Sequence, residues 1–194
     1  MKTPRSLFSL RRKASFSLWR FVISVLALAP LAVLPRGYAL PMGAQVVAGQ
    51  VNVAQSGAAM TLTQGTKNAI VNWQSFNLGA GENLRLAQSG ADAALLARVT
   101  GGDPTALLGA LKADGKLFLI NPKGIVVGPG AVIDTAAFTA STLDVADADF
   151  LRGGAMTFQG DSAAGIVNLG QISAREGSVR LFAHTVKNAG TIAA

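Results

Sequence analysis

Few residues of this 194-residue chain have the types and spacing that catalysis requires. His184 is the sole histidine, and it follows the alternating stretch VRLFA, which is typical of a strand end rather than of a general base. Asp144, Asp147 and Asp149 lie close together, but their loop lacks the central glycine and terminal glutamate of an EF-hand calcium site. The chain has no cysteine, which excludes thiol catalysis and cysteine-ligated metals. The sequence therefore predicts a protein that is not an enzyme and that has no cofactor or metal site.

Two aromatic residues could serve either in a core or in a ligand site. Trp73 and Phe76 lie between alternating segments and have Ile70, Val71 and Leu78 as apolar neighbours, so we expect them to plug one end of the core. The alternative is an exposed platform that binds glycans, which would make the domain itself a glycan- or cell-binding adhesin. A weaker alternative is a β-helical polysaccharide-processing enzyme, which would need several acids in one groove.

A tight turn is the most distinctive short motif. In FLINPKGIVVG, residues 118–128, two apolar runs flank Asn121, Pro122, Lys123 and Gly124. An asparagine can bond to its own backbone, proline fixes φ, and glycine relieves crowding, so these four residues predict a turn between buried strands.

The segments that must position these residues are short and alternate at period two. Apolar residues alternate with small or polar ones at 59–65, 82–88, 115–120, 130–136, 155–160 and 177–183. Glycine, asparagine or aspartate bounds each segment, which is typical of an all-β protein. Residues 91–113 are the exception, because their apolar spacing predicts two short helical pieces interrupted by Gly101, Gly102 and Pro104.

A repeat near the C-terminal end favours one β architecture. The segments 168–174 and 188–194 share the pattern N-x-G-x-I-x-A at an offset of 20 residues. This offset pairs Asn168 with Asn188, Gly170 with Gly190 and Ile172 with Ile192. Stacked coils of a parallel β-helix require such a repeat, with the isoleucine inward and the glycine at a corner. The alternative is a sandwich of antiparallel hairpins.

The excess of basic over acidic residues lies entirely in the first 39 residues of the chain. The sequence has 17 Lys and Arg against 10 Asp and Glu. Seven of the basic residues and none of the acids fall in 1–39, so the rest has 10 (17 − 7) of each and no formal charge. This balance argues against a nucleic-acid partner. Basic residues followed by the apolar stretch 21–34 and by Gly37-Tyr38-Ala39 predict a signal peptide cleaved after Ala39. A permanent N-terminal anchor is the alternative, although 14 residues are short for a membrane span.

Several segments occur in the order of a known family. They are LPMGAQVVAGQ (40–50), IVNWQSFNLGAGE (70–82), the stretch 98–134, TASTLDVADADFLRGG (139–154) and the terminal N-x-G-x-I-x-A segments. Together they resemble the N-terminal two-partner secretion (haemagglutination activity) domain of filamentous haemagglutinin-like exoproteins. The resemblance covers residues 40–194, and it implies a right-handed parallel β-helix with an N-terminal cap and extra-helical hairpins.

The family resemblance also implies a route and partners. Such domains pass through the Sec translocon and signal peptidase into the periplasm of Gram-negative bacteria. An outer-membrane β-barrel transporter with POTRA domains then recognises them, and the exoprotein is secreted or stays on the cell surface. A downstream passenger of the adhesin or haemagglutinin type would contact the host cell surface.

The family hallmark N-P-N-G-[IL] stands here as Asn121-Pro122-Lys123-Gly124-Ile125, with lysine in place of the usual asparagine. The resemblance makes Asn121, Pro122, Lys123 and Gly124 the candidates for recognition by the transporter. A second family motif, N-P-N-L, has no counterpart. Asp103-Pro104-Thr105 keeps turn chemistry in that region but is a different element.

Overall fold

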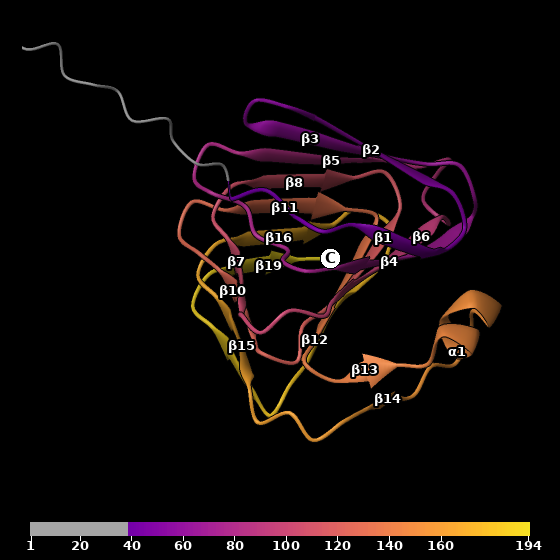
Figure 1. Cartoon of the computed structure of the whole chain (residues 1–194). Helices are drawn as coiled ribbons and strands as arrows, with labels where there is room; N and C mark the ends of the chain where they lie inside the picture. The colour runs from indigo at the N-terminus through magenta and orange to yellow at the C-terminus, as the bar shows by residue number, and fades with distance from the viewer. Residues whose placement is uncertain (1–38) are drawn as a thin grey trace, which may run out of the picture. The chain divides into compact units, whose positions relative to one another are not determined.

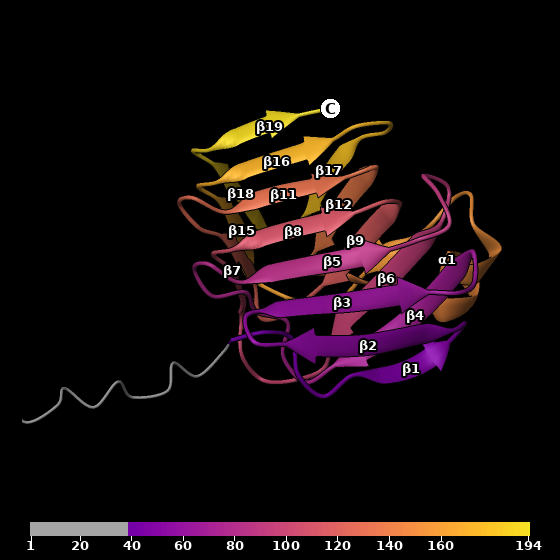
Figure 2. The same cartoon turned by 90° about the horizontal axis from the view of Figure 1, so that it is seen from above.

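A computed structural model of the chain describes residues 39–194. The leader predicted at 1–39 lies outside the described residues, apart from Ala39. The described chain winds into a right-handed coil whose strands form three faces (Figures 1 and 2). This is the parallel β-helix predicted from the 20-residue repeat, and the antiparallel sandwich is wrong.

Between residues 83 and 188 each turn of the coil adds one strand to each face, and neighbouring turns pair in parallel. The parallel strands of the first face are β3 (Ala59–Gln64), β5 (Asn83–Ala87), β8 (Ala110–Ala113), β11 (Val132–Thr135), β16 (Gln171–Ala174) and β19 (Thr191–Ala193). Those of the second face are β4 (Asn68–Trp73), β6 (Ala94–Val99), β9 (Lys116–Ile120), β12 (Ala137–Ser141) and β17 (Val179–Phe182). Those of the third face are β7 (Thr105–Leu107), β10 (Ile125–Val127), β15 (Gly165–Asn168) and β18 (Thr185–Asn188).

The core is a set of columns of identical or similar side chains. Along the first face the paired positions are Met60, Leu84, Leu111, Ile133, Ile172 and Ile192. All but the last are buried, because each side chain packs between those of the turns before and after it. Ile192 stands on the final described strand, where no turn covers it, and it is 37% exposed.

An N-terminal cap closes the first turn. Strand β1 (Gln45–Ala48) pairs antiparallel with β4, and β2 (Val51–Ser56) pairs antiparallel with β3 (Figure 2). The reversed direction ends the parallel stacking, so the open edge of the first parallel turn is paired rather than exposed.

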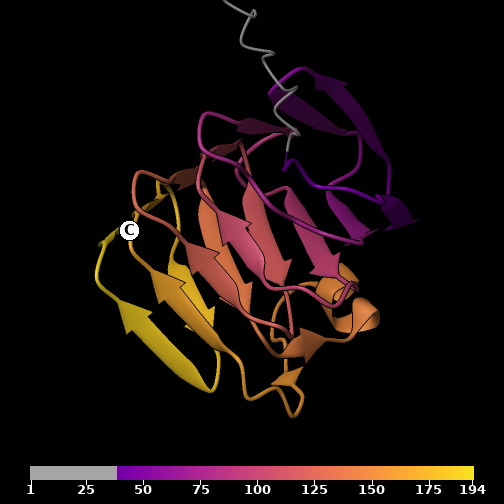
Figure 3. The same ribbon diagram turned by 60° about the vertical axis from the view of Figure 1, so that its left-hand side comes forward.

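One excursion leaves the coil after β12, and we call residues 143–160 the excursion. It holds β13 (Asp144–Val145), helix α1 (Asp147–Arg152) and β14 (Phe158–Gln159), and β13 pairs antiparallel with β14. The resemblance implied extra-helical hairpins, and this pair is the one found in residues 39–194. Figure 3 shows the excursion beside the strands of the second face. Helix α1 has six residues, and no helix in the described chain is long and apolar enough to cross a bilayer.

The helical pieces predicted at 91–113 are wrong, because β6, β7 and β8 occupy that stretch. Strand β6 is buried on both sides. Leu95 points into the main core, while Leu96 packs under the excursion with Phe150. A strand that is covered on both faces loses its period-two pattern, and its continuous apolar run then resembles a helix.

Candidate recognition site

The motif turn lies at the corner between the second and third faces. Asn121 follows β9, Gly124 precedes β10, and the Gly124 N–H donates to the Asn121 carbonyl at 3.0 Å. The four residues therefore close a β-turn between two buried strands, as their types predicted.

The Asn121 side chain is fully buried and ties this turn to the preceding coil. Its Nδ2 donates to the Asp103 carbonyl and to Thr105 Oγ1, each at 3.0 Å. Its Oδ1 accepts from the Lys123 backbone N–H at 2.9 Å. All three bonds are made to groups inside the protein. In the folded domain the Asn121 amide is therefore not in contact with solvent.

Gly124 is also buried, and its backbone requires glycine. Its φ is +111°, a conformation that L side chains rarely adopt. A Cβ there would lie 3.2 Å from the Gly165 carbonyl oxygen of the following coil. Asn121 and Gly124 therefore act as the base of the turn.

Pro122 and Lys123 form the exposed tip of the turn. Ser162, in the next coil, donates from its Oγ to the Pro122 carbonyl at 2.7 Å and so holds the tip from the other side. The motif is thus divided into a buried base and an exposed tip. Only the tip can touch a partner while the domain is folded.

The repeat residues stack as a second asparagine site. Asn168 is buried and donates from Nδ2 to Asn188 Oδ1 at 2.8 Å, while the two asparagines are paired in register. Each Oδ1 also accepts a backbone N–H two residues later, from Gly170 at 3.1 Å and from Gly190 at 3.3 Å. A Cβ on Gly170 would lie 2.6 Å from the Gly128 carbonyl oxygen, and one on Gly190 would lie 2.1 Å from the Gly170 carbonyl oxygen. Ile172 and Ile192 pair on the adjoining strands.

Trp73 and Phe76 are both buried in the main core and pack edge to face, with ring centroids 5.5 Å apart. A glycan-binding platform needs exposed ring faces. These two residues cannot supply them in the folded domain, and their role as a plug stays a prediction.

The three clustered aspartates make structural contacts. Arg98 on β6 donates from Nε to Asp144 at 2.9 Å and pairs through Nη2 with Asp147 at 2.7 Å. Burial disfavours the charge on Arg98, but these two carboxylates raise its pKa above the ordinary value. Asp149 pairs with Arg152 within α1. Arg98 therefore anchors the start of the excursion to the second face.

The described residues also offer few other groups for catalysis or metal binding. His184 is exposed, and within residues 39–194 no three His, Cys, Asp or Glu side chains are close enough together to hold a metal ion.

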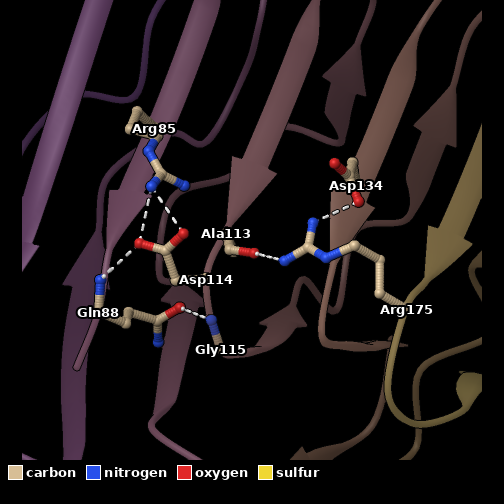
Figure 4. A network of polar contacts seen from close by, with 7 residues as sticks. All are labelled: Arg85, Gln88, Ala113, Asp114, Gly115, Asp134 and Arg175. Carbon is tan, nitrogen blue, oxygen red and sulfur yellow. Dashed lines mark hydrogen bonds and ion pairs between the residues drawn. The ribbon is translucent and has the colours of Figure 1, made fainter. Parts of the chain in front are cut away.

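Charged residues on the outer side of the first face bond across coils (Figure 4). Arg85 donates through Nη2 to both oxygens of Asp114, at 2.6 and 2.7 Å. Arg175 pairs with Asp134 and donates to the Ala113 carbonyl at 2.8 Å. Burial by itself would raise the pKa of Asp114, but Arg85 and the Gln88 N–H lower it overall. These pairs brace neighbouring coils.

The sequence pattern identified the motif turn but not the residues that hold it. Thr105, Asp103 and Ser162 all belong to neighbouring coils. A signal was present, because Ile125 pairs with Thr105 at the same 20-residue offset that relates Asn168 to Asn188. Extending that offset upstream would have placed Thr105 beside the motif.

Comparison with known proteins gives concordant matches. The family model described as the TPS secretion domain matches residues 38–194. Two curated relatives from Haemophilus influenzae, both named heme/hemopexin-binding protein, are 38% and 34% identical over 106 residues. These alignments cover 55% and 54% of this chain but 12% and 11% of the relatives, so the chain spans about a ninth of their length.

A solved structure, the HMW1 secretion domain from Haemophilus influenzae, is 36% identical with a TM-score of 0.72. That match covers 78% of this chain and 41% of the other.

Proposed function

The chain belongs to the TPS secretion domain family. We propose that a partner transporter recognises residues 40–194 by binding the exposed tip of the motif turn. The chain is thus the secretion domain of a two-partner secretion exoprotein, and such exoproteins are exported. Membership of this family implies an outer-membrane transporter as partner.

The finer route is also proposed. The leader of residues 1–39 engages the Sec translocon, and signal peptidase cuts after Ala39. In the periplasm the POTRA domains of the transporter bind the partly folded domain, in which the coils around the motif turn have formed and free strand segments add to a sheet edge. The passenger is of the adhesin or haemagglutinin type and acts at the cell surface. The remaining coils then bury one another outside the cell, because each completes the core of the last.

The division of the motif turn is the observation that carries the proposal. Asn121 and Gly124 are buried, so these two residues maintain the conformation of the turn and do not contact a partner. Pro122 and Lys123 are exposed and presented at a fixed corner by the Ser162 bond. The lysine that departs from the family pattern therefore lies where a partner can contact it.

Secretion by cells that co-express the partner barrel tests the proposal. We expect Pro122→Ala and Lys123→Ala to reduce the protein in the medium by half or more while the melting temperature is unchanged. Lys187→Ala is the matched control, since Lys187 is an exposed lysine on β18, and it should be secreted normally. Asn121→Ala and Gly124→Ala should also reduce secretion, but with a lower melting temperature. Normal secretion of both tip variants would refute recognition through the tip.

A further inference from the structure

Glu82 is a buried carboxylate at the capped end of the coil. The residue is 5% exposed and lies just before β5. Its Oε2 accepts the Gly79 N–H at 2.7 Å, and its own N–H donates to the Gly79 carbonyl at 3.0 Å, so the turn holds the carboxylate in one orientation. Among residues 39–194 the ion pairs do not include Glu82.

The other oxygen of Glu82 faces the start of the described chain. Oε1 accepts the Ala39 N–H at 2.7 Å, across 43 residues of sequence. The residues that follow are fixed in place: Leu40 is 2% exposed within the main core, and the Met42 N–H donates to the Ser75 carbonyl at 2.9 Å. The backbone at 39–42 is therefore docked against the first coil with its amino end on the carboxylate.

We propose that Glu82 binds the α-ammonium group that removal of the leader creates. This inference rests on the proposed cleavage after Ala39, which makes Leu40 the first residue. The Ala39 nitrogen lies 2.7 Å from Oε1. Successive backbone nitrogens lie less than about 4 Å apart, so the Leu40 nitrogen lies within about 7 Å of Oε1, and a shift of the new first residue brings its ammonium group to hydrogen-bond distance. Cleavage removes a neutral amide donor from Oε1 and supplies a charged donor beside it.

The physical reason is the burial of the charge. A buried carboxylate that meets only neutral N–H groups lacks a counter-charge, whereas an ammonium donor adds the attraction between opposite charges to the hydrogen bond. Before cleavage the segment 39–42 has the weaker contact. After cleavage the segment 40–42 has the stronger one through its ammonium group, and the N-terminal end of the coil becomes more stable. Leader removal and closure of this end are thereby coupled.

A protease-cleavable version of the full chain tests the inference without relying on export. The sequence Ile-Glu-Gly-Arg is inserted between Ala39 and Leu40, and factor Xa then releases the leader and leaves a free amino group on Leu40. Thermal unfolding is measured before and after the cut. From the added attraction between the ammonium group and the carboxylate we expect the cut to raise the melting temperature by roughly 3–6 °C.

Two variants separate this effect from the mere loss of the leader. Glu82→Gln keeps the size of the side chain but removes its charge, and it should abolish the rise. Glu176→Gln makes the same change at an exposed residue, and the rise should persist. An equal rise in Glu82→Gln and in the unsubstituted chain, or no rise in either, overturns the proposal.

The proposed function fails in a different way. If the mass of the protein recovered from the periplasm shows an intact leader, the export route is wrong, while the factor Xa experiment still decides the role of Glu82.

Discussion

Replacing Asn121 by alanine removes three hydrogen bonds from a fully buried corner. Two run from Nδ2 to the Asp103 carbonyl and Thr105 Oγ1, and one runs from the Lys123 N–H to Oδ1. At about 1 kcal/mol net for each bond, the variant should lose roughly 3 kcal/mol of unfolding free energy. For a domain of this size 1 kcal/mol corresponds to about 4 °C, so we expect the melting temperature to fall by about 10 °C.

The assay is thermal unfolding of the purified protein, followed by circular dichroism in parallel for Asn121→Ala and Lys123→Ala. Lys123 is exposed and its backbone N–H survives the substitution, so its variant should stay within about 0.5 kcal/mol of the unsubstituted protein. The pair thus compares the base of the turn with its tip. A difference of 2 °C in melting temperature corresponds to about 0.5 kcal/mol. If the melting temperature of Asn121→Ala lies within about 2 °C of that of the unsubstituted protein, then the buried amide does not hold the turn and the division into base and tip is wrong.

Three further outcomes follow from other contacts. Gly170→Ala should lower the melting temperature by several degrees, because its Cβ would lie 2.6 Å from the Gly128 carbonyl oxygen, whereas Gly102→Ala, with no atom within 4 Å, should not. Arg98→Met should loosen the excursion and speed its cleavage by a protease in limited proteolysis, because Asp144 and Asp147 lose their partner; unchanged cleavage would contradict the anchoring role. Asp114 has a pKa lowered in the folded state, so its contribution to stability is present above its unfolded pKa near 3.8 and is lost as the pH falls through the folded value. Asp114→Asn should therefore lower the melting temperature more at pH 7 than at pH 2, and an equal loss at both pH values would refute the ion pair with Arg85.

Much of the architecture was predictable because the β-helix repeats a local pattern. Alternating segments predicted β3, β5 and β11 on the first face and β9 and β17 on the second. The offset of 20 residues predicted the parallel pairing of Asn168 with Asn188 and of Ile172 with Ile192. The excursion was the main gap. Helix α1 covers six residues, with Asp147 and Asp149 in its first turn, and a helix so short leaves little periodicity in the sequence.

The sequence alone also determined the turn chemistry of residues 121–124 and the separation of the basic leader from a neutral domain. It could not determine which of the four motif residues are buried. That depends on Asp103 and Thr105 in the coil before and on Ser162 in the coil after, 16 to 40 residues away. The carboxylate of Glu82 and the backbone of Ala39 likewise meet across 43 residues. Period and turn type are properties of neighbouring residues, whereas burial and partners arise only when separate coils stack, and for this protein only the tertiary structure decided them.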